Sequence, residues 1–238
     1  MSTMRAAQFR FHGILNDFLP GDKKHAAFTS TFQDGQSIKH LIESLGIPHT
    51  EVGQIVVNGK TVDVNYLARD YDQVEIHPAQ PGCPIEPRFL LDSHLGKLTT
   101  YLRILGFDCL YRNDYTDKEL IDLVLHEKCI LLTRDRRLLM RKVVTYGYCL
   151  HSLEPQEQLL EVVRRFDLIS KITPFRRCLR CNHPLEPISK EAILERLEPL
   201  TKRYYEEFHH CPSCDQIYWK GSHYERMLRL IDNVVIQV

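Results

Sequence analysis

In Phe89-Leu90-Leu91-Asp92, a short apolar run ends in a carboxylate, and this pattern indicates the architecture of the chain. A second apolar run, Ile130-Leu131-Leu132, is followed by Thr133-Arg134-Asp135. Short apolar runs that precede helical patterns are typical of buried parallel strands, and open α/β sheets bind ligands at the carboxyl ends of such strands. We therefore expect Asp92 and Asp135 to share one edge of a parallel sheet. An Asp after a strand also commonly caps a turn or helix, which is the alternative.

Strand and helix patterns alternate from residue 88 to residue 166. The predicted strands are 88–91, 107–111, 129–133 and 148–150. Apolar residues recur at helical spacing in 95–105, 120–125, 138–143 and 159–166. Because crossovers between parallel strands are right-handed, this order predicts a parallel α/β/α sandwich.

Further carboxylates follow the second predicted strand. Asp114 and Asp117 come after this strand, whereas Asp108 begins it at the opposite edge and is left out of the predicted site. In the first turn of the next helix, the negative charge of Asp117 also stabilises that helix through its dipole, by about half a kcal/mol. Glu119 is a further candidate ligand, and the alternative is that it completes a capping box with Thr116.

Clustered carboxylates repel one another unless a cation neutralises them, and Mg²⁺ and Mn²⁺ are hard cations that take oxygen ligands. We predict that Asp92, Asp117 and Asp135 are catalytic and bind Mg²⁺ or Mn²⁺. Two such ions about 4 Å apart activate a water and neutralise the leaving oxygen in phosphodiester hydrolysis. Basic side chains around Asp135 suit a phosphate backbone, with a solvated helix face as the alternative. They are Arg134, Arg136, Arg137, Arg141 and Lys142.

Length and charge exclude several classes of protein. With 238 residues, 43% of them hydrophobic, the chain can bury cores and is not a disordered protein. Lys plus Arg equals Asp plus Glu at 31 each, so nucleic-acid contacts must come from local patches. No apolar run approaches the roughly 20 residues of a membrane span, and the N-terminus lacks the apolar core of a signal peptide. We expect a cytoplasmic protein with no membrane partner.

Residues 1–80 carry the pattern of a β-grasp, or ubiquitin-like, domain. Strand-like segments at 6–11 and 27–32 precede a helix that Ser37 caps. Asn58-Gly59 between two apolar runs is the strongest short hairpin signal, and 73–76 forms the last strand.

This segment resembles the small sulfur-carrier proteins of the thiamine and molybdopterin type, through Val57-Asn58-Gly59-Lys60 and Asp72-Gln73-Val74-Glu75-Ile76. Those carriers need a free terminal Gly-Gly, whereas this segment continues into His77-Pro78. We therefore expect the domain to dock a protein partner or to position its neighbour.

A proline-rich stretch from Pro78 to Pro87 is a composition break suited to a stiff linker. We place a domain boundary there. The predicted division is a β-grasp domain at 1–80, the parallel α/β domain at 87–172 and a cysteine module at 173–238. The predicted fold class is therefore α/β and α+β multidomain.

Two Cys-x-x-Cys pairs, Cys178 with Cys181 and Cys211 with Cys214, are separated by 29 residues. Four thiolates at this spacing are a strong structural-zinc signal, since tetrahedral Zn²⁺ takes four ligands. A closed site of four cysteines has no open position for water, so we predict a structural zinc ribbon. The other cysteines are scattered singly, which fits a reducing compartment.

Tyr218 and Trp219 follow the second cysteine pair. Aromatic side chains of this kind stack on nucleic-acid bases. Covering a small core is the alternative for both.

The motifs Phe89-Leu90-Leu91-Asp92, Leu95-Gly96-Lys97-Leu98, 102–108 and 131–136 together resemble the Mut-seven C-terminal RNase domain family of PIN-like nucleases. The resemblance covers about residues 88 to 225, and bacterial members similar to this chain also carry a ubiquitin-like N-terminal domain. It implies a PIN-like fold and metal-dependent RNA cleavage, with Asp92 and Asp135 at acidic positions of the family. Asp117 is the third match.

We therefore predict a ribonuclease that hydrolyses RNA at an acidic site with Mg²⁺ or Mn²⁺, and that holds zinc at its four paired cysteines. The alternative is a non-catalytic module that binds RNA or the ribosome through a degenerate PIN-like scaffold. A sparse set of carboxylates is the main argument for that alternative.

Overall fold

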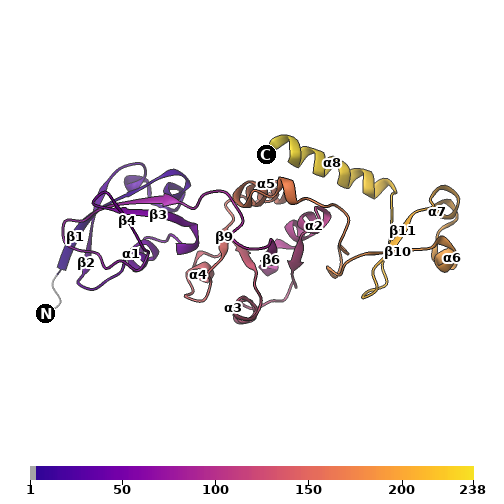
Figure 1. The fold of residues 1–238 in the computed structure, drawn as a ribbon, viewed down its shortest axis with the longest axis horizontal. Helices are drawn as coiled ribbons and strands as arrows, with labels where there is room; N and C mark the ends of the chain where they lie inside the picture. The colour runs from indigo at the N-terminus through magenta and orange to yellow at the C-terminus, as the bar shows by residue number, and fades with distance from the viewer. Residues whose placement is uncertain (1–3) are drawn as a thin grey trace. The chain divides into compact units, whose positions relative to one another are not determined.

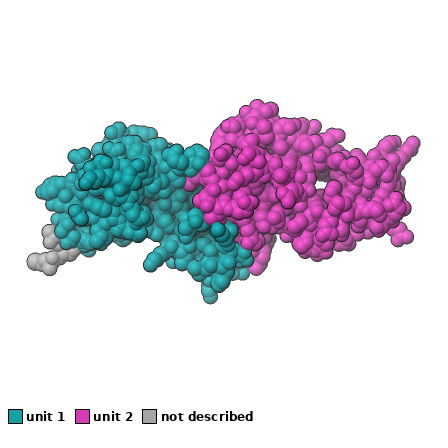
Figure 2. Space-filling model, viewed as in Figure 1, with its two compact units in different colours: residues 1–81, 117–150 teal, residues 82–116, 151–238 magenta. Residues whose placement is uncertain are grey.

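The computed structural model describes residues 4–238, and Figure 1 shows its elements. Contacts divide the chain into two compact units (Figure 2). The first contains the residues up to Pro81 together with Asp117–Leu150, and the second contains Gly82–Thr116 together with His151–Val238. No helix within 4–238 is long and apolar enough to cross a membrane.

The first unit contains a mixed five-stranded sheet in the order β2-β1-β5-β3-β4. Its strands are β1 (Met4–Phe11), β2 (Phe28–Gln33), β3 (Val52–Val57), β4 (Lys60–Val62) and β5 (Gln73–Pro78). β1 and β5 run parallel, and the other neighbours are antiparallel. The helices are α1 (Ile38–Ser44) and the short 3-10 helices η1 (Gly13–Phe18), η2 (Gly21–Lys23) and η3 (His49–Glu51). This is the predicted β-grasp arrangement.

Local sequence signals explain these elements. The Ser37 hydroxyl accepts a hydrogen bond from the His40 N–H at 3.3 Å and caps α1 as predicted. Asn58 and Gly59 have φ values of 51° and 78°, as a two-residue type I′ hairpin turn requires. The predictions of the cap and of the hairpin are thereby confirmed.

The parallel strands are β6 (Arg88–Leu91), β7 (Asp108–Leu110), β8 (Ile130–Thr133) and β9 (Gly147–Cys149), in the order β7-β6-β8-β9. β6 pairs with β7, and β8 with β9, in parallel register. The helices between and after them are η4 (Ser93–Leu95), α2 (Gly96–Ile104), α3 (Asp117–His126), α4 (Arg136–Leu139), α5 (Pro155–Phe166) and η5 (Ile169–Lys171). The mixed α/β class is as predicted. The predicted helix at 138–143 is wrong in its bounds, because α4 starts directly after Asp135 and ends at Leu139.

The C-terminal part forms an antiparallel sheet in the order β10-β11-β12. Its strands are β10 (Glu186–Ile188), β11 (Phe208–His210) and β12 (Ile217–Trp219). Between β10 and β11 lie α6 (Lys190–Ile193), the 3-10 helix η6 (Leu194–Arg196) and α7 (Pro199–Tyr204), and α8 (Ser222–Gln237) follows β12. A small core of Ile193, Leu197, Phe208 and Ile217 holds the inserted helices on the sheet.

Candidate active site and zinc centre

Asp92 directly follows β6 and begins the turn into α2. The turn closes through a hydrogen bond from the Leu95 N–H to the Asp92 carbonyl at 2.9 Å. The Asp92 side chain makes no capping hydrogen bond to the 3-10 turn that it precedes. Its Oδ1 accepts a hydrogen bond from the Ser93 hydroxyl at 3.1 Å, and the residue is half-buried. The alternative, in which the Asp92 side chain caps this turn, therefore does not apply.

Tyr111 and Gly96 fix the position of this turn. The Tyr111 hydroxyl donates a hydrogen bond to the Ser93 carbonyl at 2.8 Å. A Cβ atom on Gly96 would lie 2.6 Å from that hydroxyl, so a side chain there would displace it. Burial raises the pKa of Tyr111, and the negative charge of Asp92 adds to this shift. Tyr111 therefore remains a neutral hydrogen-bond donor beside the carboxylate.

Asp135 is the N-cap of α4. Its Oδ1 accepts a hydrogen bond from the Arg137 N–H at 2.8 Å, and its own N–H donates to Thr133 Oγ1 at 2.9 Å. Capping a helix, the alternative to metal binding, is thus a real role of Asp135. The residue is exposed, and an ionised carboxylate accepts several hydrogen bonds or ligands, so the cap does not exclude a metal at Oδ2.

Asp117 is the first residue of α3 and is exposed. Asp114, the other candidate after β7, is held by a bidentate ion pair with Arg112, with Nε–Oδ1 and Nη2–Oδ2 distances of 2.9 and 3.0 Å. The hydrogen bonds from Arg112 lower the pKa of Asp114. Asp114 is therefore already neutralised by a neighbouring side chain.

The three predicted metal ligands belong to different compact units. Asp92 lies in the unit with β6 and β7, whereas Asp117 and Asp135 lie in the unit with β8 and β9. Each carboxylate follows or opens an element of the parallel α/β region, as the sequence predicts. That these three carboxylates bind the same metal ions stays a prediction.

The predicted basic residues around Asp135 do not behave alike. The guanidinium carbon of Arg136 lies 4.7 Å from the centroid of the buried Phe18 ring, and its Nη1 is 3.5 Å from the Phe18 carbonyl. This contact occupies Arg136 within its own unit. Arg136 is nevertheless exposed, as are the other four side chains, Arg134, Arg137, Arg141 and Lys142.

The four paired cysteines converge at one point. The Sγ atoms of Cys178, Cys181, Cys211 and Cys214 all lie within 4.8 Å of one another. The Cys178–Cys214 and Cys181–Cys211 sulfur distances are 3.5 and 3.3 Å. Sulfurs about 2.3 Å from a tetrahedral Zn²⁺ are separated by about 3.8 Å, so the donor set fits zinc with small shifts.

The two cysteine loops share one backbone design. In each, the N–H of the first cysteine bonds a carbonyl five residues later, Cys178 to His183 at 2.8 Å and Cys211 to Gln216 at 2.9 Å. The residue after the second cysteine is left-handed in both, with φ 71° at Asn182 and 58° at Asp215. Asn and Asp tolerate this conformation because their short polar side chains bond locally.

Hydrogen bonds also tune the first sulfur. Burial raises the pKa of the Cys178 thiol, but hydrogen bonds from the Tyr218 hydroxyl and from backbone N–H groups outweigh it and lower the pKa to about 6. The Tyr218 hydroxyl lies 3.2 Å from Cys178 Sγ and accepts a hydrogen bond from the Leu179 N–H at 3.0 Å. Tyr218 thus supports the cysteine cluster, a role that neither of its two predicted interpretations named.

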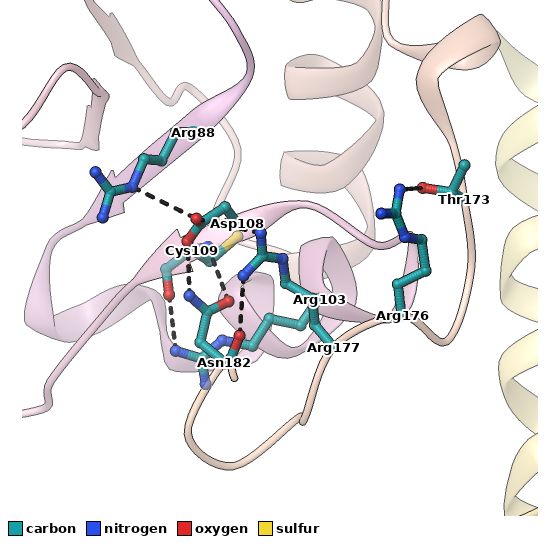
Figure 3. A network of polar contacts seen from close by, with 8 residues as sticks. All are labelled: Arg88, Arg103, Asp108, Cys109, Thr173, Arg176, Arg177 and Asn182. Atoms are coloured by element: carbon teal, nitrogen blue, oxygen red, sulfur yellow. Dashed lines mark hydrogen bonds and ion pairs between the residues drawn. The ribbon is translucent and has the colours of Figure 1, made fainter. Parts of the chain in front are cut away.

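A polar network joins the first cysteine loop to α2 and β7 (Figure 3). The buried Arg103 donates hydrogen bonds to the carbonyls of Leu179, Arg180 and Cys109 at 3.0, 3.1 and 2.8 Å. Asn182 bonds the Cys109 N–H through Oδ1 at 3.0 Å and Asp108 through Nδ2 at 2.7 Å. Sequence reasoning missed Arg103, whose only signal was a charged residue inside the apolar helix pattern.

Asp108, which the sequence assigned to the opposite edge, is held by several donors in this network. Besides Asn182, it pairs with Arg177 at 3.2 Å and with Arg88 at 3.5 Å (Figure 3). These contacts give Asp108 a structural role in the network.

Trp219 borders an aromatic pocket of about 480 Å³ beside the cysteine cluster. Trp219 is 39% exposed, and its ring centroid lies 6.5 Å from that of the core residue Phe208, so covering the core describes part of its role. Phe175 and Tyr224, whose ring centroids are 4.3 Å apart, line the same pocket, as do Arg176 and Lys220. The pocket thus combines flat apolar surfaces with charged groups, in which Glu207 pairs with Lys220 and Arg176 adds a further positive charge.

Comparison with known families covers most of the chain. The family model described as the Mut7-C RNAse domain matches residues 87–231, and the one described as Mut7-C ubiquitin matches residues 4–82. No curated protein and no solved structure matches the chain. The first match includes the parallel strands, the turn of Asp92 and the cysteine cluster, and the second includes the β-grasp sheet. The chain therefore belongs to the Mut7-C RNase domain family, with the ubiquitin-like domain of that family at its N-terminus.

Proposed function

We propose that this protein is a metal-dependent ribonuclease whose Asp92, Asp117 and Asp135 bind Mg²⁺ or Mn²⁺. The observation that carries the proposal is the position of Asp92, whose Oδ1 accepts a hydrogen bond from Ser93 in a turn that Tyr111 and Gly96 fix. Membership of an RNase domain family supplies the class of reaction.

The donor set fits hard divalent cations. All three side chains are carboxylates, Asp92 is half-buried, and Asp117 and Asp135 are exposed. Cations held there supply an activated water and neutralise the leaving oxygen. In this scheme Tyr111 and Ser93 orient Asp92, and the α4 cap orients Asp135.

RNA is the proposed substrate. The exposed side chains of Arg134, Arg137, Arg141 and Lys142 supply cations for its phosphates, while Arg136 remains on Phe18. We further propose that the four paired cysteines hold one structural Zn²⁺, since the site has no open position for substrate.

A cytoplasmic location completes the proposal. None of the eight cysteines, all of which lie within the described residues, forms a disulfide bond. Cysteines that form no disulfide bond are typical of a reducing compartment.

Cleavage of a labelled single-stranded RNA, with and without Mn²⁺, tests the catalytic site. Wild type is expected to cut only with the metal, and Asp92→Asn is expected to lose at least about a hundredfold in rate while it still binds RNA. Asp122→Asn, an exposed acid of α3, is the matched control and should retain wild-type activity. Equal cleavage by Asp92→Asn and wild type contradicts the proposal.

A non-catalytic RNA-binding module is the second candidate, favoured by the structural roles of Asp114 and Asp135. It predicts RNA binding with no cutting in wild type at any Mg²⁺ or Mn²⁺ concentration.

For the zinc assignment, Cys211→Ser should reduce bound zinc by one ion per chain in elemental analysis. An unchanged zinc content removes the assignment.

A further inference from the structure

The ubiquitin-like domain brings His12, Glu75 and His77 together on one face of its sheet. His12 directly follows β1, and Glu75 and His77 lie two residues apart in β5. β1 and β5 are parallel neighbours, and the His12 N–H donates to the Ile76 carbonyl at 2.9 Å, which fixes the end of β1. Alternate strand residues share a face and Ile76 is fully buried, so Glu75 and His77 lie on the face away from the core.

The three side chains converge on one carboxylate oxygen. His12 Nε2 lies 3.4 Å and His77 Nε2 lies 3.8 Å from Oε2 of Glu75. The two imidazole rings stack with centroids 4.2 Å apart and an interplanar angle of 8°. One ligand atom from each residue lies within 4.8 Å of the other two.

An imidazole nitrogen in this group has no hydrogen bond. His12 Nε2 is shielded from solvent and forms none with any group of residues 4–238. Shielded polar atoms normally have a hydrogen-bond partner, whereas this atom has the 3.4 Å ion-pair contact with Glu75 Oε2 in place of one. His12 Nε2 and His77 Nε2 both lie near the same oxygen, at 3.4 and 3.8 Å, so one cation can be shared by the three ligand atoms.

We infer that His12, Glu75 and His77 form a second metal site, which takes one borderline divalent cation of the zinc class. Ligand atoms about 2.0–2.1 Å from a tetrahedral zinc ion are separated by about 3.3–3.4 Å. The two measured distances of 3.4 and 3.8 Å are within half an ångström of that spacing. Small side-chain rotations close the site, while the backbone stays paired in the sheet.

The ligand set also defines the chemistry of the cation. Two imidazoles favour zinc, nickel or copper over magnesium and calcium. Three protein ligands leave a fourth position for water or for a ligand atom from outside the chain. The site thus differs from the closed cluster of four cysteines and from the all-carboxylate set of Asp92, Asp117 and Asp135.

One neighbouring charge limits the affinity. Arg10 pairs in register with Glu75 and, like it, is exposed beside buried core residues of its strand. Its positive charge opposes a bound cation. Removing this charge should therefore strengthen binding at the site.

Zinc titration of the full-length chain tests the inference. The protein is first loaded with one equivalent of Zn²⁺ for the cysteine cluster, and further ZnCl₂ is then added in a calorimeter. Wild type is expected to bind one more ion than His77→Ala, as equilibrium dialysis with elemental analysis counts directly. Glu75→Gln should weaken this second event by at least about tenfold, and Arg10→Gln should tighten it.

His40→Ala, which removes an exposed histidine from α1, is the matched control and should bind like wild type. Far-UV circular dichroism checks that each variant keeps its fold, which is expected because all of these side chains are at least partly exposed. Equal zinc content in wild type and His77→Ala overturns the inference. An equal loss in His40→Ala overturns it as well, because the second event would then be nonspecific.

Discussion

The carboxylate of Glu51 accepts a hydrogen bond from the backbone N–H of Cys149, with 2.7 Å between Oε1 and the nitrogen. Glu51 lies in η3 of the ubiquitin-like domain and is 2% exposed, and Cys149 is the last residue of β9. Nearby, His49 Nε2 lies 2.9 Å from the carbonyl oxygen of Val144. Buried polar contacts therefore join the ubiquitin-like domain to the β8–β9 half of the parallel sheet within one unit.

Replacing Glu51 by alanine should lower the free energy of unfolding by about 1–3 kcal/mol, because a buried N–H loses an acceptor. Glu51→Gln keeps an amide oxygen and should lose less. Urea unfolding monitored by circular dichroism measures both. Glu195→Ala, at an exposed position of η6, is the control, and equal stability of Glu51→Ala and this control would show that the contact contributes nothing.

Gly106→Ala should be severely destabilising. A Cβ there would lie 2.0 Å from the Thr173 carbonyl oxygen, and the residue has φ +96°. Gly59→Ala is the matched control, since Gly59 has φ +78° but open space around it. The control isolates the backbone strain of about 1–2 kcal/mol, and Gly106→Ala should lose roughly 2 kcal/mol or more beyond it through overpacking. Thermal unfolding that ranks the two variants equally would refute the clash.

Arg103→Met should loosen the first cysteine loop. It removes the side-chain donors to the carbonyls of Leu179, Arg180 and Cys109 and leaves these groups without that partner. We expect a loss of about 2–4 kcal/mol in unfolding free energy and several-fold faster release of zinc to a chelator. Arg226→Met, at an exposed position of α8, should change neither quantity. Wild-type release kinetics in Arg103→Met would argue against coupling between α2 and the cysteine cluster.

Single-stranded RNA should quench the fluorescence of Trp219, which is the only tryptophan of the chain. The half-exposed indole borders a pocket with aromatic and basic side chains, and stacking of a base is worth about 1–3 kcal/mol. Phe175→Ala should weaken the RNA affinity that quenching reports by at least about tenfold, which corresponds to 1.4 kcal/mol. Tyr204→Ala, an exposed aromatic residue of α7, is the control. RNA binding without quenching would place the nucleic acid elsewhere.

Local signals in the sequence predicted much of the fold. Ser37 and Asn58-Gly59 act within a few residues of themselves, so a helix cap and a hairpin turn could be read directly. The two Cys-x-x-Cys pairs also predicted their own convergence, because one ligand sphere explains all four residues. The boundaries at residues 80 and 172 stay predictions.

Long-range partners set the limit of such predictions. Arg103 bonds carbonyls 76 and 77 residues further along the chain, and no local pattern encodes that distance. Asp92 and Asp135 look alike in the sequence, each following an apolar run, yet only Asp135 caps the helix that follows it. The outcome depends on the turn that each residue enters, which is a 3-10 turn for Asp92 and α4 for Asp135.

The contact between Arg136 and Phe18 has a consequence for how such proteins change over evolutionary time. Removing the ubiquitin-like domain would deprive Arg136 of the Phe18 ring. The Cys149 N–H would lose its acceptor, and the Val144 carbonyl oxygen would lose its contact with a histidine. These three defects would destabilise the β8–β9 half of the parallel sheet in a chain without the ubiquitin-like domain. Selection should therefore keep the ubiquitin-like domain and Asp117–Leu150 together in one chain.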